Sequence, residues 1–134
     1  MSSVAVEADV RVAVEDLVEA MNEGNRERLR SRLAARPEAV HIGTDPNEWW
    51  TSDQVAASVG GGGPDSGITV VADQIEAHQL ADHIAWIVGK GRFRASDGKE
   101  RPVRISGVVV REDGRWRFIH THASIAVSND DLFN

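Results

Sequence analysis

Apolar residues recur along this chain with two different periods, helical in the first half and strand-like in the second. Over residues 8–22 they return every three or four positions, with acidic residues between them, which predicts an amphipathic helix. Gly24 is typical of a helix end, and Asn25 is suited to cap a second helix over 26–35. The apolar positions of the first helix are Val10, Val14, Leu17, Val18 and Met21.

The middle of the chain predicts short elements joined by turns. Residues 39–43 have the composition of a strand, and the Thr-Asp-Pro-Asn sequence at 44–47 is typical of a turn. Thr51 or Ser52 is suited to cap a short third helix that runs to Val59.

The second half predicts a meander of long strands. The run at 60–67 contains four consecutive glycines and a proline, so we expect a mobile loop there. Four segments rich in Val, Ile and aromatic residues follow, separated by turn sequences. Helices followed by a meander predict an α+β fold, a strongly curved, mostly antiparallel sheet covered by about three helices. The predicted strands are 68–80, 83–95, 101–111 and 115–127, and a polar, frayed tail is expected at 128–134.

The last hairpin decides which residues share a face of the sheet. A type I turn with a glycine bulge at Asp113-Gly114 would pair Arg111 with Arg115, so residues of equal parity would lie together. A two-residue type I′ turn would shift the pairing between the two strands by one position. The sequence is compatible with both turn types. With the first turn, one face is apolar and carries Gly107, Ile119, Thr121 and Ala123. The other face is mixed and carries Arg104, Ser106, Trp116, Phe118, His120, His122 and Ser124.

Composition narrows the function classes. The 134 residues are expected to form one domain over 1–134, with a net charge of −6 and no basic block, so we expect no nucleic-acid partner. There is no cysteine, which excludes disulfides and thiolate chemistry, and no tyrosine. Apolar runs are too short to span a membrane, and the first ten residues do not resemble a signal peptide. A cytoplasmic location is the prediction.

The order of elements and the closing strand resemble a known superfamily. The strand from Asp113 to Ser124, with its Trp…His-x-His-x-Ser pattern, is similar to the SnoaL-like branch of the nuclear transport factor 2-like superfamily. It is also similar to the association domain of calcium/calmodulin-dependent protein kinase II. The resemblance implies a cone-like half-barrel with a pocket inside, and a homodimer formed through the outer face of the sheet. It does not imply one activity, because this fold has many functions.

By this resemblance the apolar face lines the pocket and the mixed face forms the subunit interface or a polar network. Trp49 and Trp50 are expected at the pocket mouth, because indoles offer broad apolar area with one donor each. The association domain has pocket arginines where this chain has Val88, Gly107 and Ala123, which argues against a charged ligand. The predicted pocket residues are Leu17, Met21, Trp49, Trp50, Trp86, Val88, Gly107, Ile119, Thr121 and Ala123. The predicted interface residues are Arg104, Ser106, Trp116, His120, His122 and Ser124.

Asp45 is the candidate catalytic residue. Ketosteroid isomerase, a relative of this fold, has an Asp-Pro at the corresponding place that supplies the general base, and a carboxylate beside an apolar pocket has a raised pKa. The alternative is ordinary turn chemistry. Steroid isomerisation itself is not expected, because its oxyanion donors are missing: the tyrosine position falls near Leu17 and the acid position near Ser106 or Gly107.

His120 and His122 are spaced to share a metal, but no third or fourth ligand is evident, so no metal and no cofactor is expected. We expect them instead to hydrogen-bond across strands with Arg104, Ser106 and Ser124.

Two functions remain open from the sequence. One is binding of an apolar small molecule, with acid–base chemistry as in an isomerase, cyclase or dehydratase; the other is a non-catalytic dimeric or oligomeric association module. Whether the chain is an enzyme is not decided by the sequence.

Overall fold

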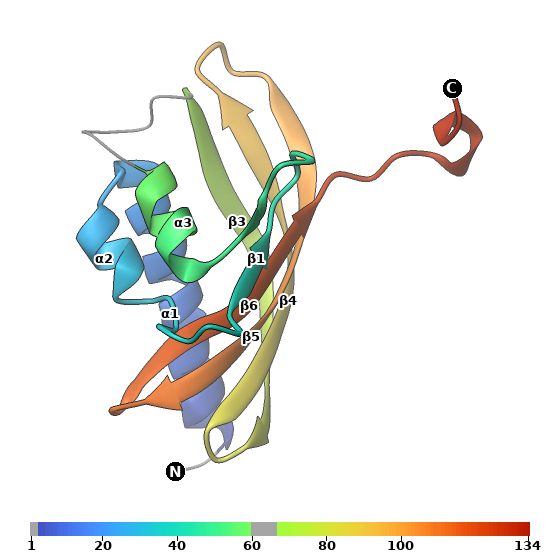
Figure 1. Cartoon of the computed structure of the whole chain (residues 1–134). Coiled ribbons are helices and arrows are strands. Elements are labelled where there is room, and N and C mark those ends of the chain that lie inside the picture. Colours follow the sequence, from blue (N-terminus) through green and yellow to red (C-terminus); the bar gives the residue numbers. More distant parts are fainter. Residues whose placement is uncertain (1–2, 60–66) are drawn as a thin grey trace.

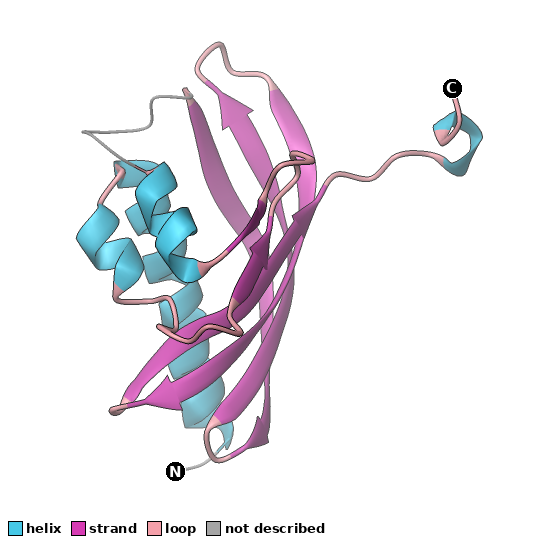
Figure 2. Ribbon diagram, viewed as in Figure 1, coloured by secondary structure: helices cyan, strands magenta, loops and turns pink. Residues whose placement is uncertain are grey.

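The computed structural model describes residues 3–59 and 67–134. These residues form one curved, open sheet with three α-helices packed on one of its faces, as Figure 2 shows. This confirms the predicted α+β class. In chain order the elements are α1 (Ser3–Glu23), α2 (Arg26–Arg30), β1 (Val40–Ile42), β2 (Trp49–Trp50), α3 (Ser52–Ser58), β3 (Ile68–Ala81), β4 (Ile84–Ala95), β5 (Glu100–Glu112), β6 (Arg115–Ser124) and the 3-10 helix η1 (Asn129–Asp131).

The sheet has the strand order β2-β1-β6-β5-β4-β3. Strands β3 to β6 form the predicted antiparallel meander, while β1 pairs in parallel with β6, with Val40 opposite His120. Strand β2 pairs antiparallel with β1. It has only two residues, too few for a sequence pattern to predict it. The β1–β2 hairpin therefore lies beside the last strand (Figure 1), so that residues about 80 positions apart form one wall.

Helix α1 covers the inner face of the sheet. Its apolar stripe, which the sequence predicted, packs on side chains from α2, β4, β5 and β6 and forms the main core. Burial of each large apolar side chain contributes about 1.5–3 kcal/mol. The core includes Val10, Ala13, Val14, Leu17, Leu29, Ile87, Val109, Trp116 and Phe118.

The second helix is shorter than predicted. Asn25 caps it as expected, with its side chain accepting from the backbone N–H of Arg28. The predicted extension to Ala35 is wrong, because the chain leaves the helix after Arg30 and bonds instead to β6. The Phe118 N–H donates to the Arg32 carbonyl at 2.8 Å, and the Ala34 N–H donates to the Phe118 carbonyl at 2.8 Å.

Helix α3 begins with a capping box. Thr51 is the cap: its hydroxyl accepts from the Gln54 N–H, and the Gln54 side chain accepts from the Thr51 N–H. Of the predicted glycine-rich loop at 60–67, residues 60–66 lie outside the described residues. None of the described helices has both the length and the apolar content needed to cross a membrane. After Ser124 the chain leaves the sheet, and η1 forms in the predicted tail (Figure 1).

The last hairpin has the two-residue turn. Asp113 and Gly114 both have positive φ angles, 52° and 75°, and Glu112 pairs with Arg115, so the predicted pairing of Arg111 with Arg115 is wrong. A bulge opposite Val108 and Val109 then inserts Ile119 as an additional residue, which restores equal parity farther along the hairpin.

The bulge divides β6 into two parts with opposite facing. Before it, Trp116 and Phe118 point toward α1 and are buried in the core. Beyond it, Ser106 pairs with His122 and Gly107 with Thr121, so residues of equal parity share a face as predicted, but the register is shifted by two positions from the predicted one. Trp116 is therefore not on the outer face, contrary to the expectation.

Candidate functional site

A cavity of about 230 Å³ lies between the helices and the inner face of the sheet. Its walls come from α1, α3, the β1–β2 hairpin and strands β3 to β6. Most of its lining is apolar, and among the described residues it has no lysine or arginine. The lining residues are Val14, Leu17, Val18, Met21, Leu33, His41, Ile42, Gly43, Thr44, Glu48, Trp50, Val55, Ser58, Val59, Val70, Ile87, Phe93, Val103, Ile105, Phe118, Thr121, His122 and Ala123.

His41 is a buried histidine in the cavity wall. It sits in the middle of β1, and only 4% of its surface is exposed. Nδ1 lies 2.9 Å from the Thr121 hydroxyl on β6, and Nε2 lies 3.0 Å from the Ser52 hydroxyl at the start of α3. The Ser52 hydroxyl in turn donates to the Ala34 carbonyl at 2.7 Å. Both ring nitrogens are thus satisfied, as a buried imidazole requires.

The environment keeps His41 neutral. Burial, with a contribution from nearby His120, lowers the pKa of the His41 imidazole from its ordinary value of 6.5 to about 4. At neutral pH one ring nitrogen therefore carries a proton and the other accepts.

Glu48 brings a carboxylate into the cavity lining. It lies at the end of the turn between β1 and β2, and its backbone closes the turn, with the Gly43 N–H donating to the Glu48 carbonyl at 2.9 Å. One carboxylate oxygen accepts from the Asp45 N–H at 3.0 Å. The side chain folds over Gly43, where a Cβ would overlap the carboxylate. Only glycine at position 43 leaves room for this arrangement.

Asp45, the predicted catalytic residue, lies outside this lining. It is exposed, and its carboxylate accepts from the Asn47 N–H at 2.9 Å, which is ordinary turn chemistry. The two acids, Asp45 and Glu48, belong to the same turn and are three positions apart. The chain direction at the turn sends Glu48, not Asp45, toward the cavity.

The structure divides the predicted pocket residues between the cavity and other places. Trp49 is 71% exposed, Trp86 and Val88 are on the outer face of the sheet, and Gly107 and Ile119 are not in the lining. Trp86 and Val88 point outward because their neighbours on β4, Ala85 and Ile87, are the buried ones. The predicted residues that line the cavity are Leu17, Met21, Trp50, Thr121 and Ala123.

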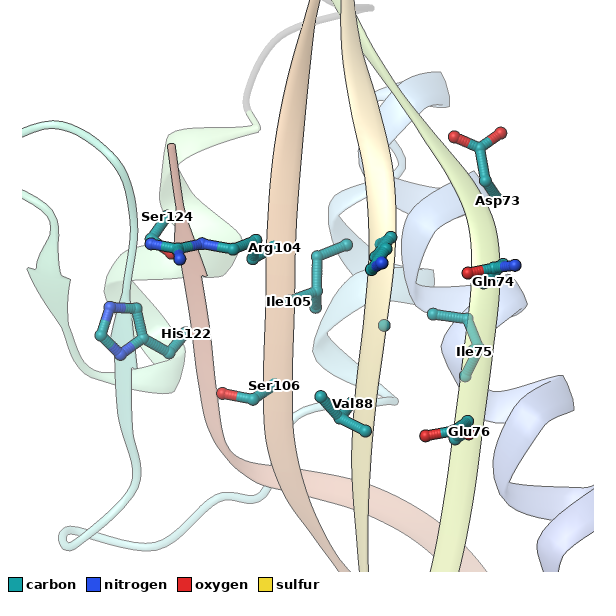
Figure 3. A pocket seen from close by; sticks show the side chains of 12 residues that line it. Asp73, Gln74, Ile75, Glu76, Val88, Arg104, Ile105, Ser106, His122 and Ser124 are labelled. Atoms are coloured by element: carbon teal, nitrogen blue, oxygen red, sulfur yellow. The ribbon is translucent and has the colours of Figure 1, made fainter. Parts of the chain in front are cut away.

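The outer face of the sheet has an open groove of about 900 Å³ (Figure 3). Four of the predicted interface residues line it, Arg104, Ser106, His122 and Ser124, and the Arg104 guanidinium donates to the Ser124 hydroxyl at 3.3 Å. Across the groove, β3 carries Asp73 and Glu76 (Figure 3).

The His120-x-His122 pair does not converge on a metal-like site. The rings of His120 and His122 are 6.4 Å apart, edge to face, and His120 Nδ1 donates to the Val40 carbonyl at 2.8 Å. His120 therefore forms a hydrogen bond to the backbone of β1, in place of the expected hydrogen bonds to Arg104, Ser106 and Ser124. Over residues 3–59 and 67–134, no three His, Asp or Glu side chains gather where a metal ion could bind.

The sequence patterns did not indicate His41 or Ser52 as wall residues, and they indicated Glu48 only as an ion-pair partner or a second carboxylate beside the Trp pair. One signal existed for the histidine: in the segment 39–43 it has the same parity as Ala39 and Gly43, which places it on one side of a short strand. Its partner Thr121 lies 80 residues away, and no local pattern connects the two.

Comparison with known proteins identifies the class. A family model described as a SnoaL-like domain matches residues 10–128. A nuclear transport factor 2-like superfamily protein from Salmonella enterica is 15% identical, with a TM-score of 0.78 and coverage of 99% of each chain. The association domain of CaMKII from C. elegans is 17% identical, with a TM-score of 0.71, covering 91% of this chain and 97% of that chain.

A third solved structure is a candidate dehydratase of the NTF2-like family from Streptomyces avermitilis. It is 16% identical, with a TM-score of 0.72, and the match covers 95% of this chain and 100% of that chain. At these identities the likenesses establish the fold alone. No protein with a curated function matches the sequence.

The fold is thus that of the nuclear transport factor 2-like superfamily, with helices over the inner face of an open, curved sheet. Within it, this chain belongs to the SnoaL-like family.

Proposed function

We propose that this chain binds a small, mainly apolar molecule in the cavity between α1, α3 and the sheet. One observation carries the proposal: the space of about 230 Å³ between the layers is bordered mainly by apolar side chains, with a few fixed polar groups in its wall. That combination is typical of ligand sites, and the volume, below the 300–1,000 Å³ of drug-sized sites, favours a small ligand.

Acid–base catalysis is the finer part of this proposal. An isomerase, cyclase or dehydratase needs a group that moves a proton at the bound substrate. Glu48 supports this role better than Asp45, because Glu48 lines the cavity and Asp45 does not. The similarity to the candidate dehydratase agrees with such chemistry but does not identify a substrate.

The binding proposal predicts that a small apolar probe stabilises the protein through this cavity. Toluene and benzyl alcohol are expected to raise the free energy of unfolding of the wild type, by about 2.7 kcal/mol at a ligand concentration 100 times Kd. In Ala123→Phe, whose new side chain occupies the cavity, this stabilisation is expected to disappear. Urea unfolding with and without probe measures both.

Val12→Phe is the matched control, because Val12 is an exposed residue of α1 outside the lining. It should keep the full response to the probes. Stabilisation that persists in Ala123→Phe, or its absence from the wild type with every probe, would contradict the proposal.

We also propose that two copies of this chain associate through the outer face of the sheet, which keeps the association-module function as the second candidate. Strand β4 exposes an apolar stripe there, with Ile84, Trp86 and Val88 exposed by 40%, 37% and 36%. Such a stripe is typical of an interaction surface. The similarity to an association domain supports the same alternative.

Charge also suits pairing of two copies. Lys90 and Arg104 beside this stripe form no ion pair within the described residues, and Glu76 lies on the opposite side of the groove. In a two-fold arrangement with its axis near β4, Glu76 of one copy would face Arg104 of the other. A self-complementary surface of this kind is what a symmetric dimer requires.

Val88→Asp is expected to convert a dimer into a monomer, because it places two carboxylates at the centre of the interface. Light scattering coupled to size-exclusion chromatography measures the mass. The exposed Val12→Asp on α1 should leave the mass unchanged. A wild type that is monomeric throughout the micromolar range would refute the pairing.

A further inference from the structure

The hydrogen-bond chain behind the cavity wall fixes where its protons lie. Ser52 has a single hydroxyl proton, and at 2.7 Å it points to the Ala34 carbonyl, which can only accept. Toward His41 the Ser52 oxygen is therefore an acceptor. The contact of 3.0 Å between Ser52 and His41 requires Nε2 of the imidazole to carry the proton and donate it.

That assignment determines the role of Thr121. With the proton on Nε2, Nδ1 of the neutral ring has only a lone pair, so the Thr121 hydroxyl donates to it across 2.9 Å. The depressed pKa of His41 agrees with a neutral ring. Thr121 lines the cavity, and because its only hydroxyl proton is used in the wall, its oxygen offers lone pairs alone to a ligand.

Two other lining groups have the same character. Ser58 on α3 donates its hydroxyl proton to the Val55 carbonyl at 2.7 Å, which leaves its oxygen as an acceptor. Glu48 contributes a carboxylate, and within residues 3–59 and 67–134 only one of its oxygens accepts from a backbone N–H, that of Asp45. No lysine or arginine of the described residues lines the cavity to balance this charge.

From this pattern we infer that the cavity selects apolar molecules that carry a hydrogen-bond donor, an alcohol or best an alkylammonium group, and rejects carboxylates. This inference rests on the proposed function, because it assigns the ligand class of the same cavity. A donor group is satisfied by Thr121 or Ser58 and attracted by Glu48, whereas at these three groups a carboxylate meets only lone pairs and a like charge.

Four probes of nearly equal size test the selection at pH 7.5: benzylamine, benzyl alcohol, toluene and benzoate, each titrated into the intact protein by calorimetry or ligand-observed NMR. Benzylamine is expected to bind most tightly, benzyl alcohol next, and benzoate at least about 100-fold more weakly than benzylamine. A hydrogen bond to a charged group commonly corresponds to about a tenfold or greater change in Kd.

Variants separate the two acceptors. Thr121→Val, which is nearly isosteric, should raise Kd for benzyl alcohol about tenfold and leave toluene unchanged, while Thr121→Ser should keep wild-type affinity. Thr69→Val is the matched control on β3, outside the lining. Glu48→Gln should raise Kd for benzylamine about tenfold without affecting benzyl alcohol, and Asp45→Asn in the same turn should change neither.

The outcomes separate this inference from the function on which it rests. If toluene binds as tightly as benzyl alcohol, or benzoate as tightly as benzylamine, the selection for donors is refuted and the apolar binding site remains. If none of the four probes binds, both the inference and the proposed binding function are refuted. Loss of benzylamine binding in Asp45→Asn instead of Glu48→Gln would overturn the role assigned to Glu48.

Discussion

Replacing Asp16 with asparagine is expected to lower the free energy of unfolding by about 3 kcal/mol, because it leaves three arginines around a neutral group. Asp16 lies on α1 and is partly buried, with 17% of its side chain exposed. Its carboxylate accepts from Arg28 on α2 at 2.6 Å and from Arg32 at 2.7 Å, and Arg115 of β6 is 3.7 Å away. This one carboxylate therefore connects α1, α2 and the last strand. Urea unfolding at pH 7 measures the loss.

The matched control is Asp73→Asn. Asp73 makes a two-fold contact with Arg92 at 2.8 and 2.9 Å, but its side chain is 40% exposed, so water screens the pair and the change should lower the free energy of unfolding far less than Asp16→Asn does. Similar losses in both variants would show that the Asp16 cluster is no more than a surface ion pair.

The Asp16 contribution has its own pH range. Burial alone would raise the pKa of the Asp16 carboxyl, but hydrogen bonds and charges from Arg32 and Arg28 outweigh it and hold the pKa below its ordinary value of 3.8. Stability from this group is present above pH 3.8 and is lost as the pH falls through the folded-state pKa.

His41 is expected to destabilise the protein in mild acid, at a higher pH than the one at which the Asp16 contribution is lost. Its pKa is about 4 in the fold and 6.5 in its ordinary state, so the unfolded chain binds the proton more tightly over that range. The contribution of neutral His41 to the free energy of unfolding is therefore fully present above pH 6.5, and it falls as the pH is lowered toward 4. By pH 5 the loss from this one group is about 2 kcal/mol. Urea unfolding at pH 7.5, 6 and 5 measures it.

Two histidine variants test the source of this slope. His41→Gln should flatten the dependence of unfolding free energy on pH between 6.5 and 5, by up to about 1.4 kcal/mol per pH unit, the value for one proton. His83→Gln, at an exposed position after β3, should keep the wild-type slope. An unchanged slope in His41→Gln would mean that another group takes up the proton.

Local rules were sufficient for most of the secondary structure. The apolar stripe of α1, the Asn25 and Thr51 caps and the strand segments of the meander each depend on residues within a few positions, so the printed sequence contains the necessary information. The end of α2 did not follow, because Arg32 and Ala34 exchange helical hydrogen bonds for bonds to β6, which is distant in sequence.

The predicted site was less accurate, and the reasons are tertiary. A two-residue turn and a bulge change the facing of β6 between Phe118 and His120, which moves Trp116 into the core. Both turn types fit the same Asp-Gly sequence, and the one that forms is the one that leaves Trp116 and Phe118 in the core. On β4 the sequence also did not specify which side chains face the helices. Trp86 was therefore predicted in the pocket, whereas it lies on the outer face of the sheet.

By itself, the sequence determined the α+β fold, the order of the helices and long strands and the apolar character of the inner face, because periodicity and capping act over short distances. Only the tertiary structure decided which polar groups meet at the cavity. It brings β1 alongside β6, so that His41 reaches Thr121, and it folds Glu48 over Gly43 while Asp45 turns to solvent. These contacts depend on the register between strands and on the direction of a single turn, which residue type and spacing alone do not specify.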